Sequence, residues 1–134
     1  MASSAYTAGV DNFLGTSFAW PAGDVRAVLI NPSLYTFSAA HSSLTDVPSG
    51  ARIATLSASL GSKAVSGGAL SAADALFPSV PAGPAAQAII LYVYGASDAA
   101  TKLLFYIDGF TVTPNGGDIT IKWDTGVNKI VRFG

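Results

Sequence analysis

Short apolar runs that end at turn signals constrain the fold of this chain more than any other feature of its sequence. The clearest run covers residues 88–94, which are apolar at consecutive positions, rich in β-branched and aromatic side chains, and followed by Gly95. A run of this length and composition is typical of a central strand. A second run, residues 101–108, follows a polar turn, so the two predict an antiparallel hairpin with a loop of about five residues.

Residues 119–123 show the alternation of a half-buried strand. Ile119, Ile121 and Trp123 share one face, and the two polar residues between them share the other. The three apolar side chains are therefore expected to face the interior. The preceding residues 114–117 read Pro-Asn-Gly-Gly, a strong turn because Asn and Gly tolerate positive φ at low cost.

The rest of the chain carries weaker signals. Residues 70–77 fit either a short helix or an extended edge, and residues 34–44 fit a helical turn capped by Ser38, a strand or a loop. Further strands are expected over residues 25–30, 51–60, 63–65 and 127–133. Together these segments predict an all-β fold, an antiparallel β-sandwich or jelly-roll-like single domain with short helical turns. The expected core comprises Val28, Ile30, Ile53, Ile90, Tyr92, Leu104, Ile119, Ile121 and Ile130.

The chain divides into a short N-terminal segment and one domain. Residues 25–134 are expected to form the β-sandwich, and residues 1–24 a helical turn or loop. Phe13, Phe18 and Trp20 are possible anchors in this segment. Two interpretations stay open: the segment is an extended arm that orders on a neighbouring subunit, or it packs on its own domain.

Charge and composition exclude several function classes. The 134 residues are 50% hydrophobic and 11% charged, with a net charge of −1 and no Cys. The lack of Cys excludes disulfide scaffolds, zinc ribbons and thiol nucleophiles. The few Lys and Arg residues are scattered, which argues against direct nucleic-acid binding. A net charge near zero favours association, as expected of an assembly subunit.

No targeting or membrane segment is expected either. The first six residues lack a basic region followed by an apolar run, so they do not resemble a secretory leader. No apolar run approaches the roughly 20 residues that a membrane helix requires. The sequence therefore predicts a soluble protein.

Residues that usually carry chemistry are scarce. His41 is the only histidine, and no serine lies in a nucleophile elbow. A surface or structural role is therefore expected for His41. All acidic residues are Asp and lie near predicted turns, where they are expected to bond local amides. No catalytic, cofactor-binding or metal-binding residue is assigned, and no enzyme activity is expected. The rival hypothesis is a glycan-degrading or glycan-binding site that uses Asp108 and Asp118 beside Tyr106 and Trp123.

Structural roles are also expected for the glycine pairs and for most aromatic residues. Gly67-Gly68 and Gly116-Gly117 are expected to be turns, because neither lies in a phosphate-binding motif. Aromatic side chains are able to form a carbohydrate platform, but most are expected in the core or at an interface. These aromatic residues are Trp20, Tyr35, Phe37, Tyr92, Tyr94, Tyr106, Trp123 and Phe133.

Four segments carry a resemblance to a known group of proteins. They are LTDVPSGARIAT at residues 44–55, LFYIDG at 104–109, TPNGGDITIKW at 113–123 and GVNKI at 126–130. Over residues 25–134 the chain resembles small virion proteins of tailed bacteriophages. The resemblance implies a particle component, made in the host cytoplasm and located in the virion, and brings no catalytic residue or cofactor.

Within that group, capsid decoration is the favoured role. Such a cement protein contacts neighbouring major capsid subunits, is a homo-oligomer, and requires neither a membrane nor direct contact with nucleic acid. The alternatives are a tail or tail-fibre component and a glycan-binding module on the virion. The lack of heptads and of glycine-periodic stretches argues against a fibre.

Overall fold

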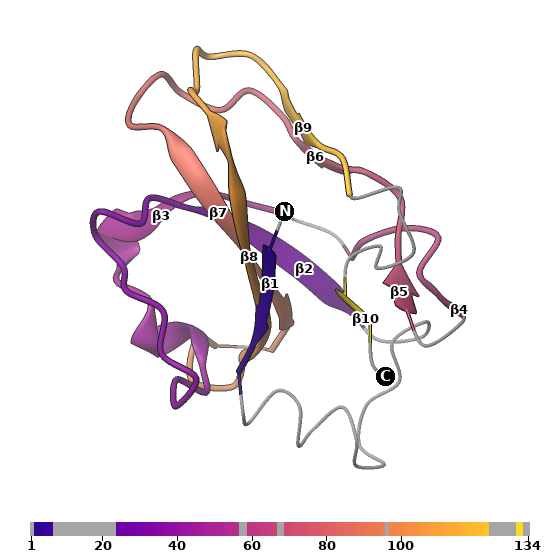
Figure 1. Ribbon diagram of the computed structural model, residues 1–134. Coiled ribbons are helices and arrows are strands. Elements are labelled where there is room, and N and C mark those ends of the chain that lie inside the picture. The colour runs from indigo at the N-terminus through magenta and orange to yellow at the C-terminus, as the bar shows by residue number, and fades with distance from the viewer. Residues whose placement is uncertain are drawn as a thin grey trace.

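A five-stranded antiparallel sheet, with strand order β1-β8-β7-β2-β3, forms the centre of the protein in the computed structural model (Figure 1). The structure describes residues 2–6, 24–56, 59–66, 69–95, 97–123 and 131–132. The strands of this main sheet are β1 (Ala2–Ala5), β2 (Val25–Ile30), β3 (Arg52–Thr55), β7 (Ala86–Val93) and β8 (Lys102–Val112).

Two smaller sheets lie on one side of the main sheet (Figure 1). One joins β10 (Val131–Arg132), β5 (Ala69–Ser71) and β4 (Ala64–Ser66) in that order, and the other pairs β6 (Ala75–Phe77) with β9 (Ile119–Ile121). The opposite side is covered by the segment between β2 and β3. That segment is irregular except for two 3-10 turns, η1 (Leu44–Asp46) and η2 (Ser49–Ala51).

The main sheet is buried on both faces, because its central strands are apolar on both faces. The side chains gather into two clusters. The first cluster lies toward the smaller sheets; its fully buried members include Leu29, Phe77, Ile89, Leu91 and Phe105. The second cluster lies under the irregular segment; its buried members include Tyr6, Val28, Ile30, Tyr35, Leu44, Val47, Ile90, Tyr92 and Tyr106.

The prediction of an all-β fold is confirmed, as are most of its strands. β2 covers the predicted residues, and β7 pairs with β8 as the predicted hairpin. The alternation at β9 is also confirmed, because Ile119, Ile121 and Trp123 are buried whereas Thr120 and Lys122 are exposed.

Several boundaries differ from the predictions. Residues 70–77 are extended in two strands, β5 and β6, so the helical alternative is wrong. β3 ends at Thr55, which is short of the predicted residues 51–60. No helix is formed at Ser38, but a single turn is: the Ser38 carbonyl accepts the His41 amide and its hydroxyl oxygen accepts the Ala40 amide. A 3-10 turn, η1, follows after Ser43. β8 continues beyond Gly109 to Val112. Its pairing with β7 shifts register between Ala86 and Ala88, so a β-bulge lies between Asp108 and Val112.

The predicted core is largely confirmed. Val28, Ile30, Ile90, Tyr92, Leu104, Ile119 and Ile121 are buried. Ile53 is only partly buried against the first cluster, because β3 is an edge strand. Ile130 lies outside the described residues, as do Phe13, Phe18, Trp20, Gly67, Gly68 and Phe133.

Residues 2–5 form a strand that sequence reasoning did not predict. β1 adds to the edge of the main sheet beside β8, with Ala2 opposite Asp108 and Ala5 opposite Phe105. The next residue, Tyr6, is fully buried in the second cluster, and its amide donates to the Leu104 carbonyl. Small residues with low strand propensity are held here by backbone pairing and by one aromatic anchor.

Candidate functional site

A chain of hydrogen bonds links Tyr6 and Tyr35 of the second cluster to the His41 side chain. The Tyr6 and Tyr35 hydroxyl oxygens lie 2.7 Å apart, and the Tyr35 hydroxyl lies 2.8 Å from His41 Nδ1. Burial, and then the hydrogen bond to Tyr35, raises the pKa of Tyr6 far above its ordinary value. The structural role expected for His41 therefore fits its place at the outer end of this chain.

Among the aspartates that the structure describes, only Asp46 bonds local backbone amides as predicted. Asp24 and Asp98 pair with arginine side chains, and Asp118 accepts an amide from a distant segment. Asp46 accepts the amides of Ser42 and Ser43 at η1, and Asp118 accepts the Ser79 amide at 2.9 Å. The amide bonds lower the pKa of Asp46. Asp108 is different: it lies within β8 and belongs to no turn, so the prediction that all aspartates are turn formers is wrong for this residue.

The residues of the rival glycan site do not gather. Asp118 is bonded to the turn after β6, and Asp108 lies in the middle of the main sheet's strand β8. Tyr106 belongs to the second cluster. Trp123 belongs to the first cluster, on the other side of the sheet, where its indole N–H donates to the Ala73 carbonyl. No common groove contains the four side chains.

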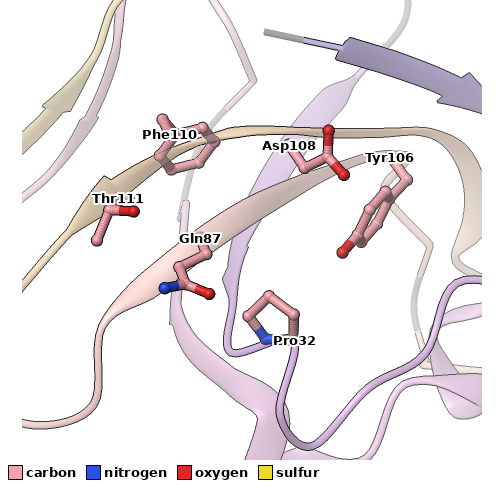
Figure 2. Close-up of a pocket in the computed structure, with 6 residues that line it drawn as sticks. All are labelled: Pro32, Gln87, Tyr106, Asp108, Phe110 and Thr111. Carbon is pink, nitrogen blue, oxygen red and sulfur yellow. The ribbon is translucent and has the colours of Figure 1, made fainter.

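Asp108 and Tyr106 instead line an open hollow on the second-cluster side of β8, which we call the Asp108 hollow. It has a volume of about 610 Å³ and is completed by Pro32, Gln87, Phe110 and Thr111. Figure 2 shows Asp108 and Tyr106 next to each other along β8, with Gln87 and Pro32 across the hollow. The hollow is wide and shallow, so it offers little enclosure to a small ligand.

A more enclosed hollow lies at the other end of the same sheet face, and we call it the arginine pocket. Its volume is about 370 Å³. The floor is formed by Tyr92, which stands opposite Arg26 across the β2–β7 pair. The other lining residues are Leu44, Arg52, Thr55, Leu56, Tyr94, Gly95, Ser97, Asp98 and Thr101.

Both arginines of the pocket are held in place. Arg26 Nε and Nη2 donate to the two oxygens of Asp24, and its guanidinium carbon lies 3.6 Å from the Tyr94 ring centroid. Arg52 donates to the carbonyls of Leu44 and Val47 and to Asp98 Oδ2, the last at 2.9 Å. Arg26, Arg52 and Asp98 are the charged residues that line the pocket, whereas Asp24, which binds Arg26, is not part of the lining.

Sequence reasoning did not single out these arginines. Arg26 meets Tyr92 only through the register of two strands far apart in the chain, for which the sequence carries no signal. Arg52 lies within the segment LTDVPSGARIAT. Its side chain holds this segment in its folded conformation, because it donates to the carbonyls of Leu44 and Val47 at η1.

A third hollow borders strand β6. It has a volume of about 240 Å³, and its lining includes Leu56, Leu60, Leu76 and Pro78. Leu76 is 50% exposed, and β6 pairs with β9 on one side and with no other strand in the described part of the chain. We call this region the β6 edge. An unpaired strand edge beside apolar side chains is a surface to which a further strand can add.

Other functional classes find little support in the described ranges. Among these residues no cluster of His, Asp or Glu is suited to hold a metal ion. The helical turns that the structure describes are too short to cross a membrane. Neither a scan against protein-family models nor a search of curated proteins finds a match to this chain.

Proposed function

We propose that this chain is a structural protein of a tailed-bacteriophage particle, a decoration subunit that binds across neighbouring major capsid subunits and carries no catalytic activity. The proposal takes its biological setting from the resemblance of residues 44–55 and 104–130 to small virion proteins. The physical observation that carries it is the β6 edge, where a strand paired on one side only in the described part of the chain carries an exposed leucine.

The resembling segments build the structure around this edge. Gly116, at φ 90°, allows the turn that leads into β9, and its amide donates to the Val80 carbonyl at 2.8 Å. The Val80 amide donates back to the Gly117 carbonyl, and Asp118 holds the Ser79 amide. The PNGGD turn therefore fixes the β6–β9 pair, so the segment that carries the resemblance also determines the shape of the proposed binding surface.

The β6 edge suits a protein partner better than a small molecule. Leu76 is half exposed and lies next to Leu56 and Pro78, so a partner gains both main-chain bonds and apolar burial there. In our proposal the partner is a strand of the major capsid protein, and copies of this chain repeat with the capsid lattice. Location in the tail, or in its fibres, is the alternative role.

Copy number in purified particles tests the proposal. Decoration requires on the order of hundreds of copies per particle, because each copy matches a repeated lattice position, whereas a closed tail ring requires a handful to tens. Quantitative mass spectrometry against the major capsid protein of the phage that encodes this chain gives the number. A low number assigns the chain to the tail, and its absence from particles overturns the proposal.

A substitution at the β6 edge tests the surface itself. Leu76→Lys removes an exposed apolar side chain and adds a charge, so affinity for particles lacking the wild-type protein is expected to fall about ten- to a hundredfold. Leu34→Lys is the matched control, since Leu34 is 55% exposed on the irregular segment. Equal binding by the two variants, both folded by circular dichroism, would contradict a role for this edge.

A further inference from the structure

Asn115 and Gly116 form the one Asn-Gly pair of the sequence, and the pair lies in an exposed turn before β9. An asparagine followed by glycine is chemically reactive, because the backbone nitrogen of the glycine can attack the side-chain carbonyl carbon of the asparagine. Glycine favours this attack, since it has no side chain to block the approach and adopts many backbone conformations. The turn therefore contains both groups that the reaction requires.

The reaction needs these two residues and water. The Gly116 nitrogen forms a bond to Asn115 Cγ, the bond from Cγ to Nδ2 breaks, and ammonia leaves with the proton that the Gly116 nitrogen gives up. Water then opens the resulting cyclic imide at either of its two carbonyls. One product is aspartate. The other is isoaspartate, in which the main chain runs through the side-chain carbons and is longer by one methylene group.

In the folded protein the attacking nitrogen is already engaged in a hydrogen bond. The Gly116 amide donates to the Val80 carbonyl at 2.8 Å, and the Val80 amide donates back to the Gly117 carbonyl at 3.0 Å. The Asn115 side chain is held as well, because its Oδ1 accepts the Gly117 amide at 3.0 Å. Attack requires the Gly116 nitrogen to lose its proton and to move toward Cγ, and both changes break its bond to Val80. The turn therefore has to open before it reacts.

The turn after β6, to which this turn is bonded, contains a strained residue. Ser79 has a φ of 49°, in the left-handed region that is unfavourable for a residue with a side chain. Its amide donates to Asp118 Oδ1 at 2.9 Å, and this bond joins the turn after β6 to the turn before β9. Without the Asp118 carboxylate the strained residue loses a bond that holds it in place. Asp118 is therefore expected to control how often the two turns separate.

We propose that Asn115 is a latent site of self-modification, which converts to aspartate and isoaspartate when the two turns separate and is protected while they are bonded. The isoaspartate product lengthens the turn, and either product adds a carboxylate three residues before Asp118, so the converted chain pairs the turns less well. Separation of the β6–β9 pair thereby becomes irreversible. The inference does not rest on a role in phage particles, because the reaction needs only the turn and water.

Incubation of the purified chain, folded in neutral buffer or unfolded in urea, tests the protection. Peptide mapping by mass spectrometry measures conversion at each asparagine, and labelling by an isoaspartate methyltransferase measures the isoaspartate product. Conversion of Asn115 is expected to be at least about tenfold slower in the folded chain, since it proceeds only from the open turn. Asn31 is the internal control, because Pro32 follows it and has no amide N–H. Equal rates in the folded and unfolded chain, or no conversion of Asn115 in urea, overturn the proposal.

Two matched aspartate variants show which bonds provide the protection. Asp118→Ala removes the acceptor of the Ser79 amide and is expected to speed conversion in the folded chain about three- to tenfold, the effect of one exposed hydrogen bond on turn opening. Asp46→Ala is the control, because Asp46 also accepts backbone amides but lies in the segment on the opposite side of the main sheet. Circular dichroism checks that both variants fold, and in urea all three chains are expected to convert at one rate. An unchanged rate in folded Asp118→Ala, or an equal increase in Asp46→Ala, overturns the proposal.

Discussion

The two faces of the main sheet are covered in different ways. The first cluster is covered by strands, β5, β6 and β9, and its buried side chains are aliphatic residues, two phenylalanines and Trp123, with no tyrosine. The second cluster is covered by an irregular segment and contains four tyrosines, Tyr6, Tyr35, Tyr92 and Tyr106. One face is thus closed by regular pairing and apolar packing, and the other by aromatic side chains that carry hydroxyls.

The difference explains where the hollows with polar groups lie. The irregular cover does not extend over the whole second face, so Tyr92 and Tyr106 reach its two uncovered ends and line the arginine pocket and the Asp108 hollow. The strand cover of the first face leaves an apolar hollow at the β6 edge. The two faces therefore differ in what they present: hollows lined by polar side chains on the second face, and an apolar hollow at the edge of the first.

The largest expected effect compares two adjacent isoleucines of β7. Ile89 faces the first cluster and Ile90 the second, and both are fully buried. Ile89→Ala is expected to lower the free energy of unfolding by about 3–5 kcal/mol, and Ile90→Ala by about 2–4 kcal/mol, because an irregular cover relaxes into a cavity more readily than paired strands. Urea unfolding measures both. Equal costs, or a larger cost for Ile90→Ala, would show that the two covers are equally rigid.

A second comparison tests the outer layer of the first face. Ile121 is buried on β9, whereas its neighbour Thr120 is exposed. Ile121→Ala is expected to cost about 2–4 kcal/mol, and Thr120→Ala less than about 0.5 kcal/mol. Chemical denaturation of the two variants provides the measurement. A small cost for Ile121→Ala would mean that the β6–β9 pair contributes little to the first cluster.

The first face was largely predictable from sequence, for a physical reason. Apolar runs and strict alternation report burial directly, so β7 and the inward side chains of β9 follow from residue types alone. β8 was predicted too short because Gly109 resembles a break, whereas the register shift beside Ala86 lets the strand continue. Periodicity does not encode such a bulge.

The second face could not be predicted in the same way. The cover from Asn31 to Ala51 has no period, because it is held by individual bonds such as those from Arg52 to the carbonyls of Leu44 and Val47. The arginine pocket depends on the register that places Arg26 opposite Tyr92. The role of Asp46 was visible from its neighbours in sequence, because it accepts the amides of Ser42 and Ser43, whereas the bond from Ser79 to Asp118 joins two distant segments.

A smaller effect is expected from the hydrogen-bonded tyrosines of the second face. Tyr35→Phe removes the bonds to Tyr6 and His41 and leaves the fully buried Tyr6 hydroxyl unpaired, at a cost of about 1–3 kcal/mol. Tyr6→Phe removes one hydroxyl and leaves the Tyr35–His41 bond intact, so about 0.5–1.5 kcal/mol is expected. Thermal unfolding, with the exposed Tyr94→Phe as control, ranks the three. A cost for Tyr6→Phe above that for Tyr35→Phe would contradict the central place of Tyr35.

The smallest expected effect is a pH dependence of stability, caused by Asp46 in the irregular segment that covers the second cluster. Hydrogen bonds from the Ser42 and Ser43 amides lower the pKa of Asp46 in the folded chain below its ordinary value. A lowered folded pKa means that the carboxylate stabilises the fold at pH values above the ordinary pKa of Asp, and that this stabilisation is lost as pH falls through the folded pKa.

Asp46→Asn is therefore expected to reduce stability modestly at neutral pH, and to approach the wild type at acidic pH where both side chains are uncharged. Asp74→Asn is the control, since Asp74 is exposed and makes no hydrogen bond to the described residues. Thermal unfolding across the acidic range compares the three proteins. Because Asp46 is exposed, solvent screens its charge and the difference is expected to be small. A gap between Asp46→Asn and wild type that widens toward acid would mean that the carboxylate does not hold η1, and that Arg52 alone fixes this end of the cover.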